Sequence, residues 1–130
     1  MIGMHFGTAS VAGCQFTFVS NGNFIASGSV TAYSDIRLKT NIKPIENALE
    51  KTLKLKGVTY DRTDTSDLSR QTGLIAQDVL EVLPEAVVGT EDTHYAVAYG
   101  NMVGLLVEAI KEQQSQIDEL KSLVKQLLAK

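Results

Sequence analysis

From Asn101 to Lys130, hydrophobic positions recur at alternating spacings of three and four residues. This heptad pattern is typical of a helix that associates with other helices along a narrow seam. One set of seam positions is β-branched, and the other is leucine except for one glutamine, which can fix the register at some cost in stability. The seam comprises Val103, Leu106, Ile110, Gln113, Ile117, Leu120, Val124 and Leu127. We therefore predict a self-associating coiled-coil helix, with two or three strands both compatible with the pattern.

The first 33 residues are rich in Gly, Ser, Thr and Ala and contain short alternating hydrophobic runs. Phe16–Val19 and Phe24–Ser27, separated by the turn residues Asn21–Asn23, are predicted to be strands joined by a tight turn. So few bulky side chains do not offset the entropy lost on ordering the segment. We expect it to fold only with copies of itself or with an upstream part of a longer protein.

Between Asp35 and Ala98 the pattern changes from one element to the next. Pro44 followed by a hydrophobic stripe at Ile45, Leu49 and Leu53 predicts a helix of about three turns that ends near residue 57. Beyond it the sequence predicts a strand at 58–60, an exposed polar loop or projecting hairpin at 61–71, a buried strand at 72–76, and a short helix at 78–83. The fold class expected is α+β: a small mixed globular domain with short N-terminal strands and a long C-terminal helix.

Composition narrows the classes of partner. With 130 residues, the chain forms one small core. A net charge of −3 and scattered basic residues disfavour nucleic acid and membrane as partners. Its single cysteine, Cys14, excludes an internal disulfide, and no apolar run approaches the roughly 20 residues that span a bilayer. We expect a soluble protein without nucleic acid or membrane partners.

The segment from Ser34 to Lys39 carries the candidate chemistry. A serine hydroxyl with a lysine amine as general base is a known alternative to the Ser-His-Asp triad, so peptide cleavage is a candidate activity. The competing interpretation is a turn or helix cap with a surface ion pair. A spacing of five places the two side chains together on neither a helix nor a strand, so a dyad needs a bend between them or a lysine from a neighbouring subunit.

Other candidate sites are weaker. His5, His94 and Cys14 lack metal-ligand spacing, so no metal site and no cofactor are predicted. Glu46 and Glu50 lie at helical i, i+4 spacing and indicate a solvated face rather than a pair of glycosidase acids.

Three motifs in this order give a resemblance to a known family. They are Ser34-Asp35-Ile36-Arg37-Leu38-Lys39 with Ile42, Gly73-Leu74-Ile75-Ala76-Gln77-Asp78-Val79 with Leu83-Pro84-Glu85-Ala86-Val87, and Val107-Glu108-Ala109-Ile110-Lys111-Glu112. From residue 34 to its end, the chain resembles the C-terminal intramolecular chaperone domain of bacteriophage tail spikes, tail fibres and endosialidases, a self-cleaving Ser-Lys family.

The resemblance implies an organisation and a site. It implies a homotrimer, with 1–33 as the end of an upstream triple β-helix, 34–100 as a mixed chaperone core and 101–130 as a coiled coil. It also implies Ser34 as the nucleophile and Lys39 as the base, with Asp35 and Arg37 as supporting residues. The cleavage site then lies at Tyr33, Ser34 and Asp35. Attack by Ser34 on the carbonyl of Tyr33 passes through a five-membered ring, which favours the Tyr33–Ser34 bond, while a cut at Ser34–Asp35 needs a hydroxyl from another subunit or an activated water.

The function implied is that of an intramolecular chaperone. It trimerises in the host cytoplasm during virion assembly, templates the winding of its own upstream β-helix, and releases itself when winding brings Ser34 into line with Lys39. The upstream product then stays in the virion tail. Two alternatives remain: a structural trimerisation module that never cuts, and a receptor-binding tip whose polar loop at 61–71 contacts a host surface.

Overall fold

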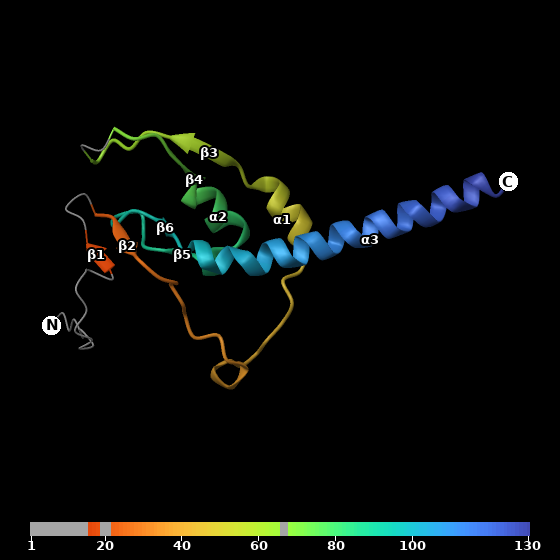
Figure 1. Ribbon diagram of the computed structural model, residues 1–130, viewed down its shortest axis with the longest axis horizontal. Coiled ribbons are helices and arrows are strands. Elements are labelled where there is room, and N and C mark those ends of the chain that lie inside the picture. Colours follow the sequence, from red (N-terminus) through yellow and green to blue (C-terminus); the bar gives the residue numbers. More distant parts are fainter. Residues whose placement is uncertain (1–15, 19–21, 66–67) are drawn as a thin grey trace. The chain divides into compact units, whose positions relative to one another are not determined.

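The computed structural model describes residues 16–18, 22–65 and 68–130. The described chain divides into two compact units, one formed by residues up to Thr40 together with part of the loop at 63–68, and the other by 41–62 and 69–130. Short antiparallel strands and a long C-terminal helix make up a mixed α+β architecture (Figure 1). The predicted fold class is confirmed, while the predicted division into 1–33, 34–100 and 101–130 stays a prediction.

The first unit contains a hairpin and a turn. Strand β1 (Phe16–Phe18) pairs antiparallel with β2 (Phe24–Ala26), and Thr17 lies opposite Ile25. Gly22, in the connection between them, has φ +90°, a backbone conformation that favours glycine. The two predicted strands are therefore confirmed within one residue of their expected ends. After β2 the chain runs without regular structure to the 3-10 turn η1 (Ile36–Leu38).

The second unit is built on α1 (Ala48–Lys54), α2 (Ala76–Val82) and α3 (Val103–Leu128). Helix α1 packs against the first part of α3 (Figure 1). The buried core is made of small and medium side chains from these helices and the turns between them: Ala48, Val79, Val82, Leu83, Ala86, Met102, Leu105 and Ala109. Burial of this apolar surface is the main stabilising term for the unit.

Two strand pairs border this core. Strands β3 (Gly57–Tyr60) and β4 (Gln71–Leu74) pair antiparallel, which confirms the predicted projecting hairpin around the polar residues between them. Arg70 closes the base of that hairpin through Asp61 Oδ2 at 2.8 Å. The second pair, β5 (Val87–Val88) with β6 (Ala96–Val97), has two residues a strand and was not predicted.

Helix α1 differs from the prediction. It begins at Ala48 rather than near Pro44, and it spans seven residues, about two turns. Asn47 at its N-cap is in the left-handed region with φ +53° and makes no side-chain capping bond. The carboxylate of Glu112 in α3 accepts from the first N–H groups of α1 instead. A residue far along the chain therefore sets the start of α1.

Candidate functional site

A single bent turn positions the predicted dyad. Asp35 and Lys39, on either side of η1, are both extended, with ψ values of 135° and 146°. Between them, Leu38 N donates to Asp35 O and Lys39 N donates to Ile36 O, each at 3.1 Å. Bonds of this i to i+3 kind reverse the chain within one turn. The residues that enter and leave the turn are thereby brought to the same side.

The bend places Lys39 on Ser34. Lys39 Nζ lies 2.6 Å from Ser34 Oγ, a short hydrogen bond between the two side chains. Of the two arrangements that the spacing of five left open, the structure has the bend within one chain. That winding of an upstream fibre brings the two groups into line stays a prediction. Their catalytic roles stay a prediction.

Asp35 and Arg37 hold the turn in shape. Asp35 Oδ1 accepts a hydrogen bond from Arg37 N at 2.8 Å, which caps η1. The same carboxylate accepts from the guanidinium, including Arg37 Nη2 on Oδ2 at 2.6 Å. The Arg37 side chain, followed by its backbone N–H, lowers the pKa of Asp35, and Asp35 in turn raises the pKa of Arg37. A supporting role for the pair in catalysis remains a prediction, but their role in the turn is direct.

The dyad is open to solvent in a single chain. Ser34 and Lys39 are both exposed, and Tyr33, the residue before the nucleophile, is 95% exposed. Residues 31–35 line a hollow of ≈ 560 Å³ beside Ser34. A hydroxyl and an amine in contact supply the geometry for a general base, but water surrounds them. The turn itself therefore shields neither group from solvent.

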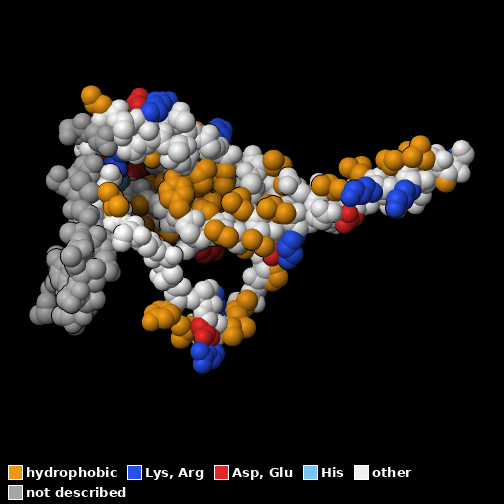
Figure 2. Space-filling model, viewed as in Figure 1, with side chains coloured by type: hydrophobic (Ala, Val, Ile, Leu, Met, Phe, Trp, Pro, Cys, Tyr) orange, Lys and Arg blue, Asp and Glu red, His pale blue; other side chains and the backbone are white. Residues whose placement is uncertain are grey.

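The heptad seam is exposed along its length. Its seven hydrophobic side chains are 44% to 68% exposed, and Gln113 between them is exposed too. Figure 2 shows hydrophobic side chains gathered along the free part of α3. A different face of the same helix, carrying Leu105 and Ala109, is buried in the core of the second unit. Helix α3 thus has one face satisfied within the chain and another without cover, as the predicted self-association requires.

Glu112 is a structural residue that sequence reasoning missed. Its carboxylate accepts hydrogen bonds from Ala48 N at 2.8 Å and Leu49 N at 2.9 Å, the first N–H groups of α1. An anion at this end of a helix satisfies backbone donors and favours the helix dipole. A signal was present in the sequence: Glu112 continues the i, i+4, i+7 face that begins at Leu105 and Ala109, where an acid needs a partner.

Neither a cluster of metal ligands nor a membrane-spanning helix is found in the described part of the chain. Among the described residues, no group of three or more His, Cys, Asp and Glu side chains is placed to hold a metal ion. His5 and Cys14 lie outside the described residues. In the same part of the chain, no helix combines the length and apolar character needed to cross a bilayer.

Comparison with known proteins bears directly on the turn. Residues 34–88 match a peptidase family described as chaperone of endosialidase, and the match begins at Ser34 itself. This part of the chain is a chaperone-of-endosialidase domain. The chain is also 43% identical over 105 residues to the long tail fiber protein Gp37 of Enterobacteria phage K3, and 44% identical over 116 residues to that of Enterobacteria phage Ox2.

The relatives place the chaperone-of-endosialidase domain in a phage setting. The aligned regions cover 75% and 82% of this chain, but only 8% of the phage K3 protein and 45% of the phage Ox2 protein. The long tail fiber protein Gp37 of Enterobacteria phage M1 is similar, with 41% identity over 82% of this chain and 48% of its own length. The chain therefore spans less than half of these relatives. Together with the family match, they support a tail-fibre chaperone role for the domain.

Proposed function

We propose that this chain is a self-cleaving intramolecular chaperone of a phage tail fibre. It assembles as a homotrimer through the seam of α3, templates the winding of its own upstream triple β-helix in the host cytoplasm, and then cuts itself free at Ser34. The single observation that carries the proposal is the 2.6 Å contact between Lys39 Nζ and Ser34 Oγ within a capped turn. A turn that is only a cap with a surface ion pair does not require this contact between Ser34 and Lys39.

The proposed chemistry is an acyl shift followed by hydrolysis. Ser34 Oγ attacks the carbonyl carbon of Tyr33, its proton passes to Lys39 Nζ, and the proton moves on to the Ser34 nitrogen as the peptide C–N bond breaks. The product is an ester between Tyr33 and the Ser34 side chain. Water then opens the ester, which leaves a carboxylate on Tyr33 and a free hydroxyl and amine on Ser34. Only the neutral amine of Lys39 can accept the first proton.

Assembly supplies what the single turn lacks. The dyad contact lies within one chain, so winding would act on the surroundings of the pair. We infer that the trimer and the wound fibre cover the exposed turn, exclude water and present the Tyr33 carbonyl to Ser34 Oγ. Association of three α3 helices along their seams also lowers the entropic cost of aligning three upstream chains at the start of winding. After release, the fibre is held by a high unfolding barrier.

The test is cleavage of a longer precursor. The 130-residue chain is expressed alone and behind the upstream segment of the phage K3 fibre protein, each as wild type, Ser34→Ala, Lys39→Ala and Lys39→Arg. The fused wild type is expected to yield two bands on a denaturing gel, and all three variants one band. Lys39→Arg is the sharpest of them, because it keeps the positive charge but cannot give up its proton.

The cut position and the alternatives follow from the same samples. N-terminal sequencing of the released piece is expected to begin at Ser34, whereas a start at Asp35 would point to an activated water or a hydroxyl from another subunit. A trimer that stays uncut in the fused wild type would favour the structural trimerisation module. Retention of the domain on assembled particles would favour the receptor-binding tip.

A further inference from the structure

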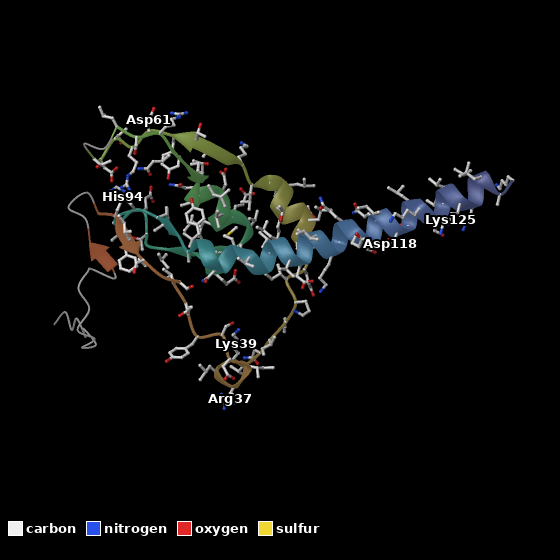
Figure 3. The ribbon with its side chains drawn as sticks, in the orientation of Figure 1. Arg37, Lys39, Asp61, His94, Asp118 and Lys125 are labelled. Carbon is white, nitrogen blue, oxygen red and sulfur yellow. The ribbon has the colours of Figure 1, made fainter. Side chains whose placement is uncertain are left out.

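Three charged side chains share the small turn that carries the dyad: Asp35, and also Arg37 and Lys39, which Figure 3 labels. Arg37 occupies both oxygens of the Asp35 carboxylate. Its Nε donates to Oδ1 at 3.0 Å and to Oδ2 at 3.1 Å, in addition to the contacts from its backbone nitrogen and Nη2. Lys39, by contrast, has Ser34 Oγ as its hydrogen-bond partner. The two cations of the turn therefore bind different acceptors: Arg37 binds the Asp35 carboxylate, and Lys39 binds the Ser34 hydroxyl.

We propose that Arg37 is a positioning residue that keeps the Asp35 carboxylate from pairing with Lys39, so that the Lys39 amine stays on the Ser34 hydroxyl. The inference rests on the self-cleavage proposed above. A carboxylate paired with a lysine stabilises the ammonium form, which has no lone pair to accept the serine proton. Because Arg37 pairs with the Asp35 carboxylate, this carboxylate does not compete with Ser34 Oγ for the Lys39 amine.

Both cations of the turn act on the Asp35 carboxylate. The pKa of Asp35 is lowered chiefly by the side-chain and backbone hydrogen bonds from Arg37, and the charge of Lys39 adds to them in the same direction. Arginine suits the task because its planar guanidinium holds two carboxylate oxygens at once and stays charged. A lysine in place of Arg37 would bind the carboxylate as a single point charge.

The competing explanation is that Asp35 and Arg37 only stabilise the turn. The double variant Asp35→Asn/Arg37→Ala separates the two ideas. Its asparagine keeps a side-chain oxygen to cap η1 but carries no charge to attract Lys39. If Arg37 shields Lys39, removal of the Asp35 charge restores what Arg37→Ala loses. If the pair is only a structural clasp, the double variant is no better than the single one.

The experiment measures how readily Lys39 reacts as a neutral amine. The full 130-residue chain is treated with an amine-acylating reagent at neutral pH, and the labelling rate of Lys39 is followed by peptide mass mapping, with exposed Lys43 as the internal standard. In Arg37→Ala, labelling of Lys39 relative to Lys43 is expected to slow about two- to fivefold, the range of an exposed ion pair. Asp35→Asn/Arg37→Ala is expected to return it to the wild-type ratio, and Arg37→Lys to fall between.

An unchanged ratio in Arg37→Ala, or no recovery in the double variant, would overturn the inference. The same variants in the fused precursor add a second measurement: cleavage is expected to slow by the same factor in Arg37→Ala. If labelling follows the expected order while the wild type is never cut, the proposed protease fails and the shielding of Lys39 stands. If the wild type cuts but labelling does not follow this order, only the role of Arg37 fails.

Discussion

The turn that carries Ser34 and the helix α3 are held by contacts of very different range. The hydrogen bonds that shape the turn join residues at most five positions apart, from the Asp35 cap to the Lys39–Ser34 contact. Helix α3 is anchored by Glu112, whose partners at the start of α1 lie more than 60 positions away. The turn is exposed but internally complete, whereas the helix is firmly anchored on one face and uncovered on the other.

This difference separates chemistry from assembly. A local turn forms at little entropic cost, so the hydroxyl and the amine can meet before any other copy arrives. The uncovered seam, in contrast, has no partner within the described chain, and in the proposed assembly it depends on further copies. Changes to the helix should therefore alter association and stability while the dyad contact persists, and changes to the turn should do the reverse. Substitutions in the helix and in the turn test whether the two regions are independent in this way. The largest effect is expected at the seam of α3.

Ile117→Asp should abolish self-association. The side chain lies on the seam and is 44% exposed in one chain, so an aspartate there would be buried against its own copies without a partner. We expect the association constant to fall by more than about 100-fold, measured by sedimentation equilibrium. Ser115→Asp, an exposed position on the same helix outside the seam, is the matched control and should remain associated. Equal association of both variants would contradict the proposal that the chain self-associates through the seam.

Glu112→Ala should destabilise the second unit without touching the turn. The variant leaves the first two N–H groups of α1 without their carboxylate, a loss of about 2 kcal/mol in the free energy of unfolding. Chemical denaturation measures it, and Glu112→Gln, which keeps one acceptor oxygen, should lose about half as much. Glu119→Ala, on the same helix and exposed, is the control expected to leave stability unchanged. If Glu112→Ala leaves the free energy of unfolding unchanged, α1 starts at Ala48 for another reason.

Gly73→Ala tests a second long-range contact. A β-carbon at 73 would collide with the phenol oxygen of Tyr99, which accepts a hydrogen bond from Leu74 N at 2.9 Å. Tyr99 is half exposed and can rotate away, so the expected cost is the lost hydrogen bond, about 1 kcal/mol. Gly57→Ala, in the paired strand, meets no atom within 4 Å and should be tolerated. Equal stability of the two variants would show that the Tyr99 bond contributes nothing.

The range of each contact also decides what the sequence could predict. The heptad of α3, the β1–β2 pair and the β3–β4 hairpin follow from local spacing, and all three are present in the structure. The early start expected for α1 was wrong, because Asn47 takes a left-handed conformation and the cap comes from Glu112. The helical spacing places Glu112 on the face of Leu105 and Ala109, but no short-range pattern tells that its partners are at the start of α1.

The sequence suggests the two side chains of the candidate site, but it does not predict the contact between them. Ser34 and Lys39 were identified from their chemical types, but a spacing of five fits neither regular element. The bend depends on Asp35 capping a turn only three residues long. Such a turn carries no periodicity to detect. The hydrogen bonds between Asp35 and Arg37 shape the turn that brings Ser34 and Lys39 together, and the sequence pattern does not show them.

The smallest expected effect concerns the charge of Asp35. Its pKa is lowered from the ordinary value of 3.8, chiefly by the hydrogen bonds from Arg37. A carboxyl with a lowered folded-state pKa stabilises the turn above the ordinary value and loses that contribution as pH falls through the lowered one. Titration of the Asp35 carboxyl carbon by NMR should thus show protonation below pH 3.8 in the wild type and closer to it in Arg37→Ala.

Arg70→Ala is the matched control for this titration. Arg70 pairs with Asp61 at the base of the β3–β4 hairpin, so its loss removes an equal charge without touching the turn. Asp35 should titrate in Arg70→Ala as it does in the wild type. The NMR signal of the Ser34 β-carbon, followed in the same acid titration, reports whether the Lys39 contact depends on the clasp. If the Ser34 signal stays constant while Asp35 is protonated, the Lys39–Ser34 contact does not need the Asp35–Arg37 pair. The backbone hydrogen bonds of η1 are then sufficient to hold the contact.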